Sequence, residues 1–306
     1  MSKYLLSLCI PTNGESRWVV PNVRQIYSLG TDNSIFEVVV ADNNPNEEMD
    51  AAMKEFEIYP NFRYVRTQAK GFYNIVENFV QAKGDFMIKL NHRCILHEGM
   101  IERIYEMGCK FIDEKPLMFF SNGSRGFKNV RTYNTFDSFL SDLSYRSSQS
   151  QGLFFWKEDL LRVDKIQFAP MSPNVSLMFD SRHKRSFVID DRPMCHEQDA
   201  SGKYGYDLFN TFAVLYLDLV NEVRIDGSIS KKTFIKIKKD IHDFLTDNYF
   251  YMKVLGKAGN YQLEAAKESM GVYYTAQSYR SMVFKSYTIK VMELIKDKIK
   301  SLFSRK

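Results

Sequence analysis

The chain has 306 residues, of which 44% are hydrophobic and 26% are charged, a balance typical of one large α/β domain with or without a helical appendage. The formal net charge of +5 is too small and too scattered along the chain to indicate a nucleic-acid-binding protein. The four cysteines have no Cys-x-x-Cys spacing, which argues against a zinc site or a disulfide framework and favours a reducing cytoplasm.

Residues 4–10 are the first apolar stretch, and they run directly into Pro11-Thr12-Asn13-Gly14. The stretch is too short for the apolar region of a signal peptide. No stretch of the chain approaches the roughly 18 consecutive apolar residues that a transmembrane helix needs. We therefore expect a cytoplasmic protein that makes at most a peripheral contact with the inner face of the cell membrane.

Short apolar runs alternate with helical patterns over the first 121 residues. The expected strands cover residues 4–10, 36–41, 62–66, 86–90 and 117–121, and the expected helices cover residues 22–29, 75–82 and 99–112, with a further helix opening near residue 47. Gly84 is expected to end one of these helices in a left-handed conformation. Regular alternation with short connections predicts a mostly parallel sheet that is covered by helices on both faces.

Polar residues follow three of the expected strands. They are Thr12 and Asn13, then Asp42 and Asn43, and then Asn91, His92 and Arg93. The carboxyl ends of parallel strands meet at one edge of a sheet, where open α/β sheets bind their ligands, so we expect the site at this edge. The simpler interpretation of residues 91–93 is a solvated turn.

The remainder of the chain is less regular and then becomes helical. We expect a helix over residues 136–145, a strand over 151–156, a short helix over 157–163, a strand over 186–189 and a long loop over 191–207, followed by helices over 208–223, 230–245, 260–270 and 279–303. Gly152 is expected at a place of close backbone approach. Segment 208–223 is apolar nearly all round, so it must be buried against this chain or in a homo-oligomer.

Four features occur in order over the first hundred residues. They are a strand ending in Ile10-Pro11-Thr12-Asn13-x-Glu15, a strand ending in Val38-Val39-Val40-Ala41-Asp42-Asn43, the run Gly71-Phe72-x-Asn74 before a helix closed by Ala82-Lys83-Gly84-Asp85, and the strand at 86–90 with polar residues behind it. This order resembles family 2 glycosyltransferases of the GT-A fold. Residues 202–212 and 227–234 look, more loosely, like abequosyltransferase-like and capsular-polysaccharide glycosyltransferases.

The resemblance implies an α/β, Rossmann-like GT-A domain over residues 1–200 and a helical C-terminal extension over residues 201–306. It implies transfer of a sugar from a nucleotide-diphosphate donor to a glycan or lipid-linked glycan acceptor in bacterial capsule or lipopolysaccharide O-antigen synthesis. The implied donor-binding residues are Pro11, Thr12, Asn13, Glu15, Asp42, Asn43, Lys70, Gly71 and Asn74. Among them, Asp42 would accept hydrogen bonds from the base, while Lys70, Gly71 and Asn74 would approach the ribose and the diphosphate.

The chain departs from the family at the acidic motif that binds a divalent metal. Asn91, His92 and Arg93 occupy this position and include no carboxylate. Asn91 or His92 can ligate Mn²⁺ or Mg²⁺, although hard ions prefer carboxylate oxygens. Alternatively, His92 and Arg93 neutralise the donor diphosphate as cations in place of a metal. We favour weak or absent metal dependence, with all three residues counted as donor-binding.

The second departure concerns the catalytic base, which is a carboxylate in inverting members of the family. The acidic pair should fall near Pro173 and Asn174, which offer no carboxylate. The nearby candidates are Asp180, Asp190, Asp191, His196 and Glu197. The loop over residues 190–197 is favoured, with Asp191, His196 and Glu197 as the chosen candidates. Because both acidic motifs are missing, a catalytically inactive sugar-nucleotide-binding or scaffold subunit is the alternative function.

The last 25 residues combine apolar side chains at helical spacing with many lysines. A basic amphipathic helix of this kind can lie on anionic lipid. The alternative is a helix packed on its own domain with a solvated basic face. We favour a peripheral membrane contact through residues 282–306, because acceptors in the family are often lipid-linked.

Overall fold

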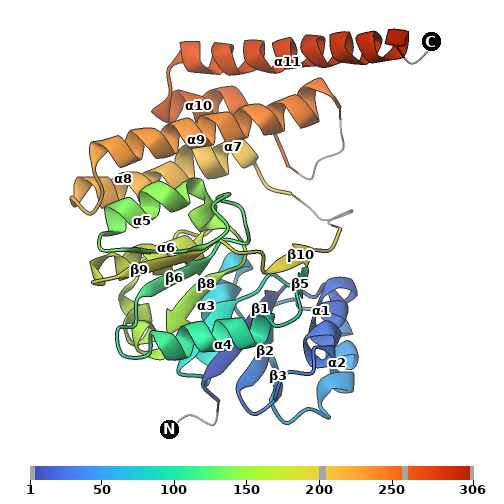
Figure 1. Cartoon of the computed structure of the whole chain (residues 1–306), viewed down its shortest axis with the longest axis vertical. Coiled ribbons are helices and arrows are strands. Elements are labelled where there is room, and N and C mark those ends of the chain that lie inside the picture. The colour runs from blue at the N-terminus through green and yellow to red at the C-terminus, as the bar shows by residue number, and fades with distance from the viewer. Residues whose placement is uncertain (1–3, 200–204, 257–260, 304–306) are drawn as a thin grey trace. The chain divides into compact units, whose positions relative to one another are not determined.

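The computed structural model describes residues 4–199, 205–256 and 261–303. They form two compact units, one within Met1–Asp199 and the other within Ala200–Lys306. The first unit holds the sheets, and the regular elements described in the second are helices (Figure 1). Residues 1–3, 200–204, 257–260 and 304–306, which belong to segments named above, lie outside this described part of the chain.

Eight strands form the main sheet of the first unit, in the order β3-β2-β1-β4-β8-β6-β9-β7. Their bounds are β1 Leu6–Thr12, β2 Phe36–Asp42, β3 Phe62–Arg66, β4 Phe86–Lys89, β6 Leu117–Phe120, β7 Val130–Tyr133, β8 Leu153–Trp156 and β9 Phe187–Asp190. The first four in this order run parallel, and β8 and β7 pair antiparallel with their neighbours. A second sheet pairs β5 (Cys94–Leu96) with β10 (Cys195–Glu197).

Helices cover both faces of the main sheet (Figure 1). They are α1 Ser16–Ser28, α2 Glu48–Met53, α3 Asn74–Gln81, α4 Met100–Lys110, α5 Phe136–Leu143 and α6 Pro173–Asp180, with short 3-10 helices η1 Lys54–Phe56, η2 Gly71–Tyr73, η3 Ser144–Ser148, η4 Lys157–Lys165 and η5 Ser181–His183. On one face, Val23 of α1, Met53 of α2 and Ile104 of α4 join one apolar core with alternate residues of the central strands. On the other face, Phe79 of α3 packs on Phe155 of β8 with ring centroids 5.6 Å apart. The predicted fold class, a mostly parallel α/β sheet flanked by helices with a helical C-terminal region, is confirmed.

The second unit consists of α7 Leu208–Asn210, η6 Thr211–Tyr216, α8 Leu217–Ile225, α9 Lys231–Tyr249, η7 Phe250–Val254, α10 Ala266–Tyr273 and α11 Ala276–Phe303. The predicted single helix over 208–223 is interrupted by η6, which is a π-helix. Its apolar side chains, such as Phe209 and Leu217, are buried in the isolated chain, so no second subunit is needed to cover them. Among the described helices, none has the length and hydropathy to cross a membrane.

The short elements β5, β7, β10 and α6 were not predicted. β10 lies within the expected loop over 191–207 and consists of Cys195, His196 and Glu197, which have no apolar alternation. Its partner β5 is about a hundred residues away in the sequence, pairing Cys195 with Leu96. Short strands that depend on such distant pairing leave no periodic pattern in the local sequence.

Gly152 and Gly84 are both required by close packing, but only Gly152 also has a left-handed backbone. Gly152, in the link before β8, has φ +88°, and a Cβ there would lie 1.9 Å from the carbonyl oxygen of Phe120, which confirms the predicted close approach. Gly84 does not have the predicted left-handed backbone. A Cβ on Gly84 would instead lie 2.6 Å from Ser7 Oγ, so glycine is required there by packing.

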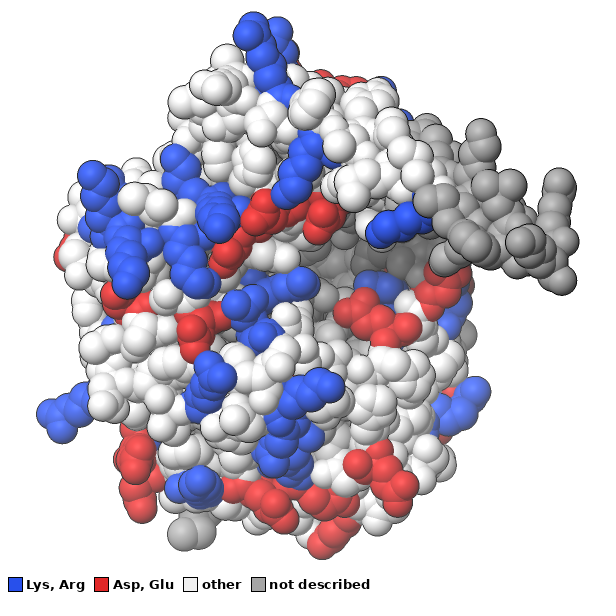
Figure 2. Space-filling view, turned by 45° about the horizontal axis from the view of Figure 1, so that its top comes forward, with Lys and Arg blue, Asp and Glu red and all other residues white. Residues whose placement is uncertain are grey.

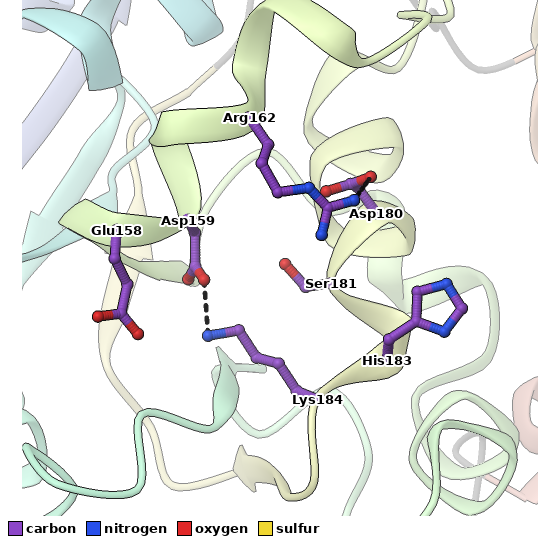
Figure 3. Close-up of a pocket in the computed structure, with 7 residues that line it drawn as sticks. All are labelled: Glu158, Asp159, Arg162, Asp180, Ser181, His183 and Lys184. Carbon is purple, nitrogen blue, oxygen red and sulfur yellow. Dashed lines mark hydrogen bonds and ion pairs between the residues drawn. The ribbon is translucent and has the colours of Figure 1, made fainter.

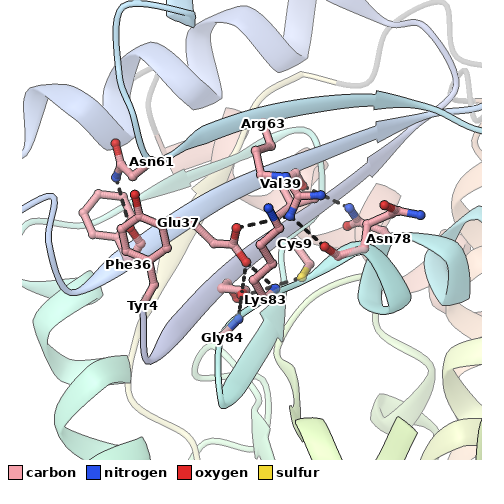
Figure 4. A network of polar contacts seen from close by, with 12 residues as sticks. Tyr4, Cys9, Phe36, Glu37, Val39, Asn61, Arg63, Asn78, Lys83 and Gly84 are labelled. Carbon is pink, nitrogen blue, oxygen red and sulfur yellow. Dashed lines mark hydrogen bonds and ion pairs between the residues drawn. The ribbon is translucent and has the colours of Figure 1, made fainter. Parts of the chain in front are cut away.

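A buried carboxylate organises the amino edge of the parallel strands (Figure 4). Glu37 of β2 is fully buried, and it accepts hydrogen bonds from Ser7 Oγ at 2.6 Å and from the backbone N–H of Lys83. Arg63 of β3 lies 3.3 Å from its second oxygen. Ser7 Oγ in turn accepts a 2.9 Å hydrogen bond from the N–H of Gly84. The network therefore fastens the end of the α3 segment to β1, β2 and β3.

Candidate functional site

A cleft of about 540 Å³ lies at the carboxyl edge of β2 and β3. It is lined by Asn43, Asn44 and Pro45 after β2, and by residues 66–71 at the end of β3 and beyond. The strand register sets this edge, because Thr12 lies opposite Asp42 and Asp42 lies opposite Arg66. Open α/β sheets bind small molecules in clefts of this size and position. The cleft brings together three of the predicted donor-binding residues, Asn43, Lys70 and Gly71.

Asp42 holds the loop after β2 and is not among the residues that line the cleft. Its side chain is fully buried, with Oδ1 accepting a 2.9 Å hydrogen bond from the N–H of Asn44 and Oδ2 lying 3.0 Å from the hydroxyl of Tyr64. Burial raises the pKa of Asp42, although these two hydrogen bonds act in the opposite direction. We therefore replace its predicted role as the reader of the base by a positioning role.

Asn43 joins the two loops that form the cleft. Its side-chain amide donates hydrogen bonds to the carbonyl oxygens of Ala69 at 2.8 Å and Gly71 at 2.9 Å. Gly71 has φ +54°, a left-handed conformation that favours glycine at this turn. Because both amide hydrogens are used, Asn43 Oδ1 is the group of this side chain that can accept a hydrogen bond from a ligand.

Two basic side chains line the cleft: that of Arg66 is bound to the protein, and that of Lys70 is exposed. Arg66 donates to the carbonyl oxygens of Asn44 at 2.7 Å and Asn46 at 2.8 Å and pairs with Asp50 at 3.2 Å, so it holds the loop after β2. Lys70 is exposed and makes no ion pair with the described residues. The sequence analysis did not predict Arg66, which ends the expected strand 62–66, or Gln68, which follows it, although both lie at the edge where the site was expected.

The side chain of Asn74 joins neighbouring elements of the sheet through hydrogen bonds. It is buried, and its amide donates 2.8 Å hydrogen bonds to the carbonyl oxygens of Thr12 and Ala41. Its side-chain oxygen accepts a 2.7 Å hydrogen bond from Thr67 Oγ1. All of its side-chain polar atoms are thus engaged in joining β1, β2 and the loop after β3.

The predicted residues at the end of β1 and just after it do not line the cleft, although Thr12 pairs with Asp42 of the neighbouring strand. Thr12 is buried, and Pro11 is half-buried within β1. Asn13 accepts a 2.6 Å hydrogen bond from the side chain of Asn44 through its carbonyl oxygen. Glu15 pairs with Arg17 at 3.4 Å. The carbonyl oxygen of Thr12 also accepts a 3.3 Å hydrogen bond from the N–H of Asn43. Thr12 and Asn13 therefore support the loop after β2.

The turn at residues 91–93 is fixed by hydrogen bonds and stacking. Asn91 Oδ1 accepts a 3.0 Å hydrogen bond from the N–H of Arg93, and its amide donates to Ser150 Oγ at 2.5 Å. The His92 ring is buried, with Nδ1 3.3 Å from Thr12 Oγ1 and its centroid 5.4 Å from the Trp18 ring. Arg93 pairs with Glu197 at 2.7 Å. The simpler interpretation of these residues as a solvated turn is therefore wrong.

These residues do not fit a divalent metal. Hard cations take carboxylate and carbonyl oxygens in an open shell, whereas the side-chain oxygen of Asn91 is bound to a backbone N–H and the His92 ring is buried. Within the described residues, no group of three or more His, Cys, Asp and Glu is arranged to hold a metal ion. We therefore assign no metal-binding role to Asn91 or His92.

Asp191, the first of the predicted catalytic candidates, is a structural carboxylate. It is fully buried, with Oδ1 bound by Ser121 Oγ at 2.7 Å and the N–H of Arg125 at 2.9 Å. Oδ2 is bound by the N–H groups of Phe127 at 2.8 Å and Lys128 at 3.0 Å. Burial acts to raise the pKa of Asp191, but these four hydrogen bonds together lower it. A carboxylate held in this way is unsuited to accept a proton from an acceptor hydroxyl.

Asp191→Asn is expected to lower the free energy of unfolding by about 1–3 kcal/mol, because an amide cannot accept all four hydrogen bonds. The lowered pKa means that the stabilisation by Asp191 is complete above the unfolded pKa near 3.9 and is lost as the pH falls through the folded pKa. Urea unfolding should therefore show a difference between wild type and variant that is constant above about pH 4 and narrows as the pH falls below it. Asp164→Asn, at an exposed position, is the control and should match wild type; equal stability of Asp191→Asn would contradict this role.

The other two catalytic candidates are exposed on β10. Glu197 keeps 38% of its side chain exposed while it pairs with Arg93. His196 lies beside His97, with ring centroids 5.9 Å apart. The pairing of β10 with β5 places both residues next to the strand that directly follows the turn at 91–93. Of the predicted base candidates, Glu197 and His196 are therefore the ones that solvent or a substrate can reach.

A second pocket, of about 400 Å³, is lined mostly by charged side chains of η4, of the end of α6 and of Lys184 after η5 (Figure 3). Lys184 pairs with Asp159 at 2.7 Å, and Arg162 pairs with Asp180 at 3.0 Å. η4 directly follows Trp156, which pairs with Phe86 at the amino end of β4. η4 therefore begins at the amino edge of the parallel strands, whereas the cleft lies at their carboxyl edge. Asp180, one of the candidates first considered for the catalytic base, lines this pocket and is paired there with Arg162. The residues favoured for the site, Asp191, His196 and Glu197, do not line it.

No protein-family model matches the chain, and no curated protein sequence matches it. Solved structures do match it in fold. S. aureus TarS 1-349 in complex with UDP-GlcNAc has a TM-score of 0.58 at 12% identity, with 92% of this chain and 89% of that chain covered. The same TarS region in complex with UDP has a TM-score of 0.57 at 12% identity, with the same coverage.

A mannosyltransferase, PcManGT from Pyrobaculum calidifontis in complex with GDP-Man and Mn²⁺, is also similar. Its TM-score is 0.51 at 11% identity, with 93% of this chain and 86% of that chain covered. At such identities the likeness concerns the fold alone. The chain therefore has the GT-A-like fold of these glycosyltransferases, a mixed, mostly parallel sheet between helices followed by a helical region.

Proposed function

We propose that the protein is a glycosyltransferase that moves a sugar from a nucleotide-diphosphate donor to a glycan acceptor. The cleft after β2 and β3 carries this proposal, because it combines an available amide oxygen, an exposed ammonium and a glycine turn at the carboxyl edge of the sheet. The fold shared with structures that hold UDP-GlcNAc and GDP-Man supports it.

Each part of the cleft has a proposed task. Asn43 Oδ1 and the amide of Gln68 hydrogen-bond the base or the ribose. Lys70 binds the diphosphate and neutralises the charge that grows on it as the bond to the sugar breaks, which is the largest electrostatic demand of such a reaction. Pro11, Thr12, Asn13, Glu15, Asp42 and Asn74 contribute by holding the loops in place.

The residues after β4 and on β10 are proposed to serve the acceptor. Glu197 would take the proton from the acceptor hydroxyl as that oxygen attacks the anomeric carbon and the nucleotide diphosphate leaves. Its pairing with Arg93 at 2.7 Å holds the carboxylate in position. His196 is the alternative base on the same strand. The buried His92 would keep the turn in place through Thr12 and Trp18 rather than act as a cation on the diphosphate.

The proposed pathway is the synthesis of a bacterial surface polysaccharide such as capsule or O-antigen, with a lipid-linked glycan as acceptor. The four cysteines are free thiols in the structure, in keeping with the cytoplasmic site expected from their spacing. The protein would work in the cytoplasm as a peripheral protein at the inner face of the cell membrane.

A thermal-shift screen of nucleotide-diphosphate sugars with Mn²⁺, Mg²⁺ or EDTA tests the proposal. We expect one donor to raise Tm by mass action, equally in all three conditions, because the turn at 91–93 offers no suitable metal ligands. Lys70→Ala should weaken binding of that donor about tenfold, through loss of one charge-assisted contact. Lys165→Ala, an exposed lysine outside the cleft, should bind like wild type. A response to no donor would refute the proposal, and a response only with metal would refute its metal-independent form.

A catalytically inactive donor-binding or scaffold subunit is the second candidate. The absence of carboxylates at residues 91–93 and 173–174 favours it, and Asn174 is buried at the start of α6. Chromatography of the donor after incubation with wild type separates the two candidates. Release of the nucleotide diphosphate that is lost in Glu197→Gln supports the enzyme, whereas binding without any release supports the subunit.

A further inference from the structure

Helix α11 (Ala276–Phe303) presents an apolar face on the side opposite to the one that packs on its own unit. Its 28 residues span about 42 Å. Met282 and Ser286 are fully buried, and Ser286 Oγ donates a 3.3 Å hydrogen bond to the carbonyl oxygen of Thr246 on α9. These residues define the packed face of the helix.

The other face is exposed and apolar. Phe284 is 74% exposed, Val291 is 55% exposed and Ile295 is 52% exposed. At about 100° per residue these three side chains point within about 20° of one direction, and Met282 and Ser286 point about 160° away from it. Tyr287 and Met292 flank the three and are 51% and 54% exposed. A row of large apolar side chains that stays in contact with solvent indicates an interaction surface.

Positive charge is concentrated in the same segment. Residues 276–306 contain eight Lys and Arg and two Asp and Glu, a net charge of +6, whereas the whole chain carries +5. The described charged side chains of α11 are all basic: Arg280, Lys285 and Lys296. Figure 2 draws a face of the molecule on which the side chains of Lys and Arg are interspersed with those of Asp and Glu.

We propose that the exposed face of α11 lies on an anionic lipid bilayer, with Phe284, Val291 and Ile295 inserted among the headgroups. Apolar contact together with basic flanks is the combination that binds helices in the plane of such a surface. A second copy of the chain would bring two segments of the same positive charge together, and nucleic acid would leave the apolar row unused. This inference deepens the proposed membrane location and rests on it, but it needs no donor chemistry.

Co-sedimentation with vesicles tests this surface without any nucleotide sugar. We expect wild type to pellet with vesicles of phosphatidylcholine mixed with phosphatidylglycerol, and much less with phosphatidylcholine alone. The triple variant F284S/V291S/I295S should lower the partition coefficient roughly a hundredfold or more. The control I58S/L161S/I225S removes three apolar side chains outside α11 that are 70–82% exposed, and it should bind like wild type.

Charge reversal supplies the second arm of the test. Arg280→Glu together with Lys296→Glu should reduce binding to anionic vesicles about tenfold or more and leave the weak binding to neutral vesicles unchanged. Failure of wild type to pellet, or equal pelleting of wild type and the apolar triple variant, would overturn the proposal. Light scattering that shows a wild-type dimer abolished by the triple variant would assign the face to a second copy instead. The donor screen is independent, so either proposal can fail alone.

Discussion

Replacing Gly152 by alanine is expected to remove about 3–5 kcal/mol from the stability of the N-terminal unit. A left-handed backbone costs a residue with a Cβ about 1–2 kcal/mol, and Gly152 has φ +88°. The new Cβ would also lie 1.9 Å from the carbonyl oxygen of Phe120. That backbone is held by the 2.8 Å hydrogen bond from the N–H of Phe120 to the carbonyl oxygen of Gly152, so it cannot move away freely. Urea unfolding followed by circular dichroism measures the loss.

Gly30→Ala is the matched control for the Gly152 variant. Gly30 has a similar φ of +75°, but a Cβ there would meet no heavy atom within 4 Å. The control should lose only the backbone component, about 1–2 kcal/mol. Equal losses in the two variants would show that the approach to Phe120 imposes no packing constraint, and would contradict this account of β6 and β8.

Glu37→Ala is the second large expected loss, about 3–5 kcal/mol. The substitution leaves Ser7 Oγ, the N–H of Lys83 and the guanidinium of Arg63 without their shared acceptor in a buried place (Figure 4). Buried donors that lose a charged partner keep their full desolvation cost. Urea unfolding is again the measurement, with the midpoint and slope compared between wild type and variant.

Glu55→Ala is the control for Glu37→Ala. Glu55 also pairs with an arginine, Arg24 at 2.8 Å, but 43% of its side chain is exposed. Exposed ion pairs contribute about 0–1 kcal/mol, so this variant should stay close to wild type. A small loss in Glu37→Ala would mean that water replaces the carboxylate, and would refute its role in joining the strands.

The strands and the edge that carries the cleft could be predicted because they depend on local patterns. The strand at 62–66, for example, matches β3 at both ends. The roles of the polar residues at that edge could not be predicted. Asp42 and Asn74 were expected to face a ligand. In the structure, Asp42 is hydrogen-bonded to Tyr64, and Asn74 is hydrogen-bonded to Thr67 and to the backbone of β2. A polar residue at a strand end can bind a ligand or hold a loop, and distant partners decide between the two.

Asp191 and Glu197 show the same limit in the loop over 190–197. Both are acids in a polar stretch, and neither periodicity nor composition separates them. In the folded chain, Asp191 accepts hydrogen bonds from four donors of the distant segment 121–128. Glu197 instead lies exposed on β10, where it pairs with Arg93. In contrast, Arg66 and Gln68 could have been predicted, because they are polar residues at the carboxyl end of an expected parallel strand, as Asp42 and Asn43 are.

A crystal structure of the protein with a nucleotide diphosphate, grown in the presence of EDTA, tests the central claim most directly. The account predicts the nucleotide in the cleft lined by Asn43, Asn44, Pro45 and residues 66–71, with the ammonium of Lys70 against the diphosphate. Nucleotide bound in the charged pocket around Lys184 and Asp159, or bound in the cleft with its phosphates turned away from Lys70, would contradict it.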